Sequence, residues 1–169
     1  ANQNNSDAQF MLGFIYYSDK YITRDISKSI HYLTLAANQN NSHAQCKLGF
    51  IYYSGEYVTR DINRSIHYLT LATNQNNSYA QYELGDIYYS GEYITRDINK
   101  SIYYLKLAAN QNNSDAQFML GFIYYSGECI TRDINRSIHY LTLAANQNNS
   151  DAQYELGDIY YSGEYIARD

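Results

Sequence analysis

Histidines and carboxylates are the residues of this sequence whose chemistry could support metal binding or catalysis. His31, His67 and His139 are separated by 36 residues and by twice that spacing. If they occupy equivalent positions on stacked helices, neighbouring side chains lie about 10 Å apart, whereas zinc–nitrogen bonds are only about 2.0–2.1 Å long. We therefore predict surface histidines and no metal site.

Two carboxylate pairs could carry acid–base chemistry. Glu83 and Asp86, like Glu155 and Asp158, stand three residues apart, so each pair would lie on one face of a helix. Acids that recur in a repeated element are more typical of a solvated or partner-facing surface. The sequence also has no Gly-rich phosphate loop and no G-x-S-x-G turn. We therefore predict no catalytic residue, no cofactor and no enzyme activity in this segment.

The composition narrows the range of partners. Twelve basic and seventeen acidic residues leave a net charge of -5, which gives no basic surface for nucleic acid. The longest apolar run, Phe10 to Tyr17, falls far short of the roughly 20 residues that cross a bilayer, so no membrane insertion is expected. Cys46 and Cys129 lack C-x-x-C spacing and are predicted to be free thiols.

A 36-residue repeat organises the whole sequence. The segments 42–77 and 114–149 differ at only six positions, and a Leu-Gly pair recurs in every copy. Self-similarity at this period is typical of solenoids. We predict one array over residues 1–169, a fragment of something longer, with units at about 6–41, 42–77, 78–113, 114–149 and a partial fifth unit at 150–169.

Each unit is predicted to begin with a helix that has a capping box. In the Ser-x-x-Gln pattern at Ser6 and Gln9, the serine oxygen would accept from the amide at the third helical position, while the glutamine reaches back to the cap. This helix should run to about Tyr17. Gly55, in the copy at 42–77, is suited to a left-handed cap at the end of such a helix.

A second helix is predicted to complete each unit. Asp61 is placed to cap a helix from Ile62 to about Thr73, with the arginine before it reaching solvent or a neighbouring unit. The closing Asn-Gln-Asn-Asn segment suits a turn, because asparagine tolerates positive φ. Helices of about eleven residues are marginal alone and must be stabilised by packing.

These features resemble a known family. The run A-Q-x-x-L-G-x-I-Y-Y-S-G-E-Y-I-T-R-D-I-x-[KR]-S-I-x-Y-L-x-L-A-A is similar to the Sel1-like repeat, a relative of the tetratricopeptide repeat. The resemblance implies an all-α, right-handed superhelical solenoid of helix-turn-helix units. It also implies that the first helices line a concave surface and that the protein serves as an adaptor for protein complexes.

Differences among the copies concentrate at four positions of the first helix, spaced i, i+3, i+4 and i+7, which fall on one helical face. The recurring Ala8, Leu12 and Tyr16 positions lie on the opposite side. We call the differing positions the variable stripe and predict that it binds the partner. It consists of Asp7, Phe10, Met11, Phe14, His43, Cys46, Lys47, Phe50, Tyr79, Tyr82, Glu83, Asp86, Asp115, Phe118, Met119, Phe122, Asp151, Tyr154, Glu155 and Asp158.

The composition of the stripe favours a protein or peptide partner with apolar and basic residues, because phenylalanine and methionine alternate along the array with acidic units. Alternative interpretations are drift on a solvated face or ordinary packing between repeats. The second tyrosine of each Tyr-Tyr pair could instead stack on a glycan. Ends without a polar capping repeat could allow end-to-end self-association. The compartment stays open, with a weak preference for the cytoplasm.

Overall fold

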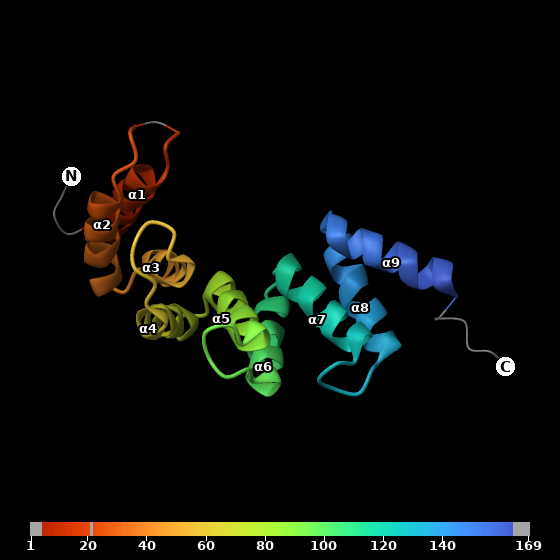
Figure 1. Cartoon of the computed structure of the whole chain (residues 1–169). Coiled ribbons are helices and arrows are strands. Elements are labelled where there is room, and N and C mark those ends of the chain that lie inside the picture. Colours follow the sequence, from red (N-terminus) through yellow and green to blue (C-terminus); the bar gives the residue numbers. More distant parts are fainter. Residues whose placement is uncertain (1–4, 21, 164–169) are drawn as a thin grey trace. The chain divides into compact units, whose positions relative to one another are not determined.

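The computed structural model describes residues 5–20 and 22–163, and within them it contains only α-helices as regular elements (Figure 1). The helices follow one another in pairs joined by short loops. Contacts divide the chain between Leu84 and Gly85, inside the fifth helix, into two compact halves. From here on we call these halves the first and second unit, and we call each 36-residue copy a repeat. The helices are α1 (Ser6–Tyr17), α2 (Ile26–Asn38), α3 (Ser42–Ser54), α4 (Ile62–Thr73), α5 (Ser78–Ser90), α6 (Ile98–Ala109), α7 (Ser114–Ser126), α8 (Ile134–Ala145) and α9 (Ser150–Ser162).

The predicted helix pairs are confirmed, but the first-helix cap lies one residue earlier than predicted. In α3 the cap is Asn41, whose Oδ1 accepts from the Ala44 amide at 3.0 Å, and Ser42 is already helical. The Gln45 side chain does not return to the cap. The capping-box prediction is therefore wrong, because asparagine fills the same role one residue before the serine.

The predicted cap of the second helix is confirmed. The Asp61 side chain accepts from the backbone amide of Arg64 at 3.0 Å, as a capping aspartate should. The turns on either side use the expected residues. Gly55 ends α3 with φ 63°, and Asn76 adopts φ 63° in the loop after α4.

The two helices of a repeat pack closely because a glycine stands at their crossing. An added Cβ at Gly49 of α3 would lie 2.6 Å from Leu69 Cγ of α4, and Leu69 is completely buried. Leu33 of α2 and Ala44 and Leu48 of α3 belong to one apolar core, which connects the first helix pair to the second. The recurring Leu-Gly pair in the sequence is thus the signature of this close approach.

Buried glutamines connect successive repeats. Gln45 donates through Nε2 to the Ala37 carbonyl of the preceding repeat at 3.1 Å. Its Oε1 accepts from Gln75 Nε2 at 2.7 Å. Gln117 forms the same two bonds with Ala109 and Gln147. The glutamine that the sequence suggested for capping therefore satisfies buried backbone between repeats.

Candidate functional site

All twenty side chains of the variable stripe are at least partly exposed, whereas the recurring alanine and leucine on the opposite face of α3, Ala44 and Leu48, are completely buried. Phe14 is 45% exposed and Met11 is 52% exposed, so α1 places two apolar side chains of the stripe next to each other at the surface. The first helices therefore hold the core with one face and present the stripe on the other.

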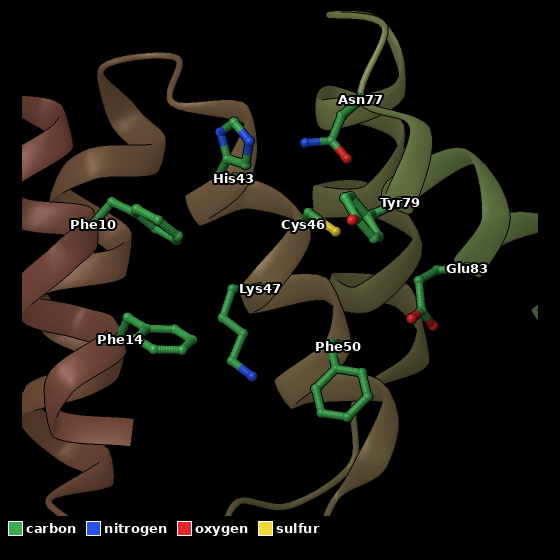
Figure 2. A pocket seen from close by; sticks show the side chains of 9 residues that line it. All are labelled: Phe10, Phe14, His43, Cys46, Lys47, Phe50, Asn77, Tyr79 and Glu83. Carbon is green, nitrogen blue, oxygen red and sulfur yellow. The ribbon is translucent and has the colours of Figure 1, made fainter. Parts of the chain in front are cut away.

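The first unit gathers much of the stripe around one pocket of about 450 Å³ (Figure 2). α1, α3 and the first turns of α5 each contribute side chains to its walls. Eight of the nine lining residues belong to the variable stripe, and the ninth is the capping residue Asn77. We call this site the first-unit pocket; its stripe residues are Phe10, Phe14, His43, Cys46, Lys47, Phe50, Tyr79 and Glu83.

Aromatic rings form the α1 side of the pocket. Phe10 and Phe14 are one helical turn apart, with ring centroids 6.4 Å from each other, and both point from α1 toward α3 in Figure 2. The His43 ring lies 5.7 Å from that of Phe10 and extends the aromatic wall. Phe10 also packs against the core of the first unit. Packing between repeats therefore explains part of the Phe10 surface, while Phe14 remains open.

Lys47 brings a positive charge into this apolar surrounding. Its side chain extends between Phe14 and Phe50 (Figure 2). The Nζ atom lies 3.6 Å from the ring centroid of Tyr17 and 4.9 Å from that of Phe50, which are cation–π distances. Burial lowers the pKa of Lys47, while the nearby Glu83 carboxylate opposes this shift.

Cys46 lies in the pocket wall as an inert thiol. Burial, together with the charge of Glu83, raises its pKa to about 12, with a smaller opposing effect from Lys47. A thiol with this pKa stays protonated near neutral pH and is a poor nucleophile. Cys46 and Cys129 are both free, as predicted.

The second unit presents the same phenylalanine pair in a different electrostatic setting. Phe118 and Phe122 of α7 have ring centroids 6.5 Å apart, close to the value for the pair on α1. The variable positions of α9 carry Glu155 and Asp158 in place of a lysine and a phenylalanine. Burial raises the pKa of Glu155, and the charges of Asp158 and Asp151 add to the effect.

Other stripe residues lie outside the first-unit pocket. Asp7 accepts a hydrogen bond from Asn41 Nδ2 at 2.9 Å, so it supports the cap of the next first helix. Asp115 accepts in the same way from Asn149 at 3.3 Å. These two aspartates thus have a structural role between repeats. The remaining stripe residues that do not line the pocket are Met11, Tyr82, Asp86, Phe118, Met119, Phe122, Asp151, Tyr154, Glu155 and Asp158.

The recurring loop arginine has a role that the sequence did not reveal. Arg60 Nε donates to the Tyr53 carbonyl at 2.8 Å and so satisfies the C-terminal end of α3. In the second unit, Arg132 makes the same bond to Tyr125 and lies 4.7 Å from the ring centroid of that tyrosine. The second tyrosine of this pair is therefore covered by a guanidinium, which leaves less of its face for stacking on a glycan.

The histidines and the first tyrosine of each pair belong to aromatic clusters. Tyr16 and Tyr32 stack with ring centroids 5.8 Å apart, and the exposed His31 ring meets the edge of Tyr32. His67 and His139 make equivalent contacts. Over residues 5–20 and 22–163, no group of three or more potential ligands is arranged to hold a metal ion. Within the same ranges, no helix is long and apolar enough to span a membrane.

Comparison with known proteins gives a consistent result. The family profile described as Sel1 repeat matches residues 6–41, 42–77, 78–113, 114–149 and 150–169. A Sel1 repeat protein from Oxalobacter formigenes is 30% identical, with a TM-score of 0.89 over 98% of this chain and 67% of that chain. The protective antigen c5321 of uropathogenic Escherichia coli strains is 29% identical, with a TM-score of 0.87 over 94% of this chain and 34% of that chain. No curated protein matches the sequence.

Proposed function

Because this chain belongs to the Sel1 repeat family, whose solenoids typically serve as scaffolds for protein interactions, we propose that it is a non-enzymatic adaptor. It binds a protein or peptide segment on the face formed by the variable stripe of its first helices. The recurring leucine, alanine and glycine positions maintain the stack, and the stripe supplies selectivity.

The observation that carries this proposal is the make-up of the first-unit pocket. Eight of its nine lining residues occupy positions at which the repeats differ, although the rest of each repeat is nearly constant. A pocket of about 450 Å³ with phenylalanine walls can accept a bulky side chain of a partner, which is how a binding hot spot is usually built.

The proposal is tested by affinity capture from the source organism, followed by direct binding to the purified partner. The variant Phe14→Ser, Phe50→Ser, Phe122→Ser removes three rings of the stripe. The control Tyr103→Ser removes an aromatic side chain of α6 that is 59% exposed and lies outside the stripe. Circular dichroism establishes that both variants fold.

We expect the native chain and the Tyr103→Ser control to bind the same purified protein. We expect the folded triple variant to bind it at least about tenfold more weakly, since buried aromatic anchors typically account for 2 kcal/mol or more. Equal binding by all three chains would remove the stripe as the binding surface.

A further inference from the structure

We propose that the first-unit pocket accepts a peptide segment in which an aromatic or aliphatic side chain is adjacent to an acidic side chain, whose carboxylate pairs with Lys47. This inference rests on the proposed function and names the chemistry of the ligand at one site. It differs from the apolar and basic segment that the sequence alone favours, because it depends on where Lys47 lies in the structure.

The surroundings of Lys47 carry the first step. Its ammonium group lies over the Tyr17 ring at 3.6 Å and near the Phe50 ring at 4.9 Å, in a half-buried position. Glu83 is the carboxylate that lines the same pocket, and in Figure 2 it stands on the α5 side, away from the Lys47 ammonium. Aromatic faces compensate only part of the hydration that a half-buried ammonium loses.

Other cations of the chain show what a satisfied ion pair looks like here. Lys28 and Lys100 each pair with the aspartate three residues earlier, at 3.2 and 3.6 Å. Arg64 and Arg136 do the same at 3.3 and 3.2 Å. Lys47 is placed differently, since most of the described residues that line the pocket with it are aromatic and Glu83 is the one carboxylate among them. A carboxylate from outside the chain can therefore approach the ammonium from the aromatic side of the pocket.

The apolar part of the ligand follows from the walls. Phe10 and Phe14 stand on one side of the pocket and Phe50 on the other, with the Lys47 ammonium between Phe14 and Phe50 (Figure 2). A side chain that fills this space displaces water from around the ammonium. A carboxylate next to that side chain then forms its ion pair in a drier setting, where charge complementarity discriminates strongly between ligands.

The second unit offers a natural contrast. Phe118 and Phe122 repeat the α1 pair, but the neighbouring first helix, α9, carries Glu155 and Asp158. The position of Lys47 is occupied by Met119 in the fourth repeat and by Met11 in the first. The acidic preference is therefore a property of the first unit, and a basic segment suits the second.

The test uses short random peptides displayed on phage with their C-termini fused, so that every carboxylate comes from a side chain. Selection is performed on the native chain, on Lys47→Met, and on the double variant Phe14→Ser, Phe50→Ser. Methionine is chosen because equivalent positions already hold it. Lys106→Met, at an exposed lysine of α6, is the control with the same change in charge.

On the native chain and on Lys106→Met we expect enrichment of peptides with Asp or Glu next to an aromatic or aliphatic residue. On Lys47→Met the apolar residue should persist and the acidic one should disappear. For one selected peptide, changing Glu to Gln should weaken binding to the native chain about tenfold and leave binding to Lys47→Met within about twofold. This last comparison on the native chain needs no protein variant.

The two levels of the proposal fail differently. Apolar peptides without an acidic preference, or an acidic preference that survives Lys47→Met, would overturn the carboxylate assignment and leave the binding surface in place. Failure to select any peptide, or identical selection by the folded Phe14→Ser, Phe50→Ser variant, would overturn the binding function of the pocket and the carboxylate assignment with it.

Discussion

At the scale of single residues, near-copies of one repeat provide their own controls. The buried serine of the second helix is an example. Ser29 Oγ donates to the Gly13 carbonyl at 2.8 Å. The corresponding Ser65, Ser101 and Ser137 hydroxyls are buried and have no hydrogen-bond partner in the described part of the chain. An unpaired buried hydroxyl is destabilising, so the same substitution should have different effects in different repeats.

We predict that the free energy of unfolding of the Ser65→Ala variant is about 1 kcal/mol higher than that of the Ser29→Ala variant. Both changes gain similar helix propensity, so the difference isolates the hydrogen bond. Urea denaturation followed by circular dichroism measures both variants. Equal changes in stability would show that the Ser29 bond contributes nothing.

The two free cysteines should react at very different rates. The pKa of Cys46 is raised to about 12 by burial and by Glu83, so its thiol stays almost entirely protonated at pH 8. Cys129, in contrast, is exposed to solvent and reagent. We therefore expect iodoacetamide to alkylate Cys129 at pH 8 while Cys46 stays unmodified. Peptide mass spectrometry distinguishes the sites, and the folded Cys129→Ser chain should take up no label. Rapid labelling of Cys46 in that variant would contradict its burial.

At the scale of helices, the sequence predicts the elements better than their ends. The 36-residue period, Gly55 and Asp61 place both helices of a repeat correctly. The first-helix cap is misplaced because Asn41 and Ser42 are adjacent and both are good capping residues. The predicted role of Gln45 is wrong for a similar reason. A glutamine at this position suits a capping box, but here its side chain donates to a carbonyl of the preceding repeat. Contacts between repeats decide such cases.

The corrected cap yields a direct test. Asn41→Ala removes the oxygen that accepts from the Ala44 amide and also the bond to Asp7, and we expect it to lower the free energy of unfolding by about 1–2 kcal/mol. Ser42→Ala should lower it by only about 0.5 kcal/mol, because Ser42 lies inside α3 and loses just the 3.3 Å hydrogen bond that its Oγ accepts from Asn77 Nδ2. Thermal melts of the two variants give the comparison. A larger loss for Ser42→Ala would restore the serine cap.

At the scale of the whole molecule, the repeat and its stripe were visible in the sequence, but the electrostatics of the stripe were not. The periodicity shows which residues share a face, since it fixes their angle around the helix. It does not show that Lys47 lies over Tyr17, a residue of the preceding repeat, or that burial raises the pKa of Glu155. Such effects arise from neighbours that are distant in sequence, and they give the two units different chemistry.

Stability in such a chain should also be local, because each helix packs mainly on its immediate neighbours. Gly49→Ala places a methyl group 2.6 Å from Leu69 Cγ and should cost about 1–3 kcal/mol. Over residues 5–20 and 22–163, no atom lies within 4 Å of a Cβ added to Gly157 of α9, so Gly157→Ala should instead stabilise α9 by about 0.5–1 kcal/mol. These two substitutions therefore probe two separate repeats with the same added atom.

Hydrogen exchange followed by mass spectrometry resolves where each effect is felt. For Gly49→Ala we expect faster exchange in α3 and α4 and unchanged exchange in α7 and α8, since the lost packing energy belongs to the first unit. For Gly157→Ala, exchange should slow in α9 and stay unchanged in α3. An equal acceleration across all helices in Gly49→Ala would mean that the chain opens as one cooperative unit. In that case a destabilising substitution in the variable stripe of one repeat would lower the stability of every other repeat. Local stability instead lets each repeat change its stripe residues without affecting the others.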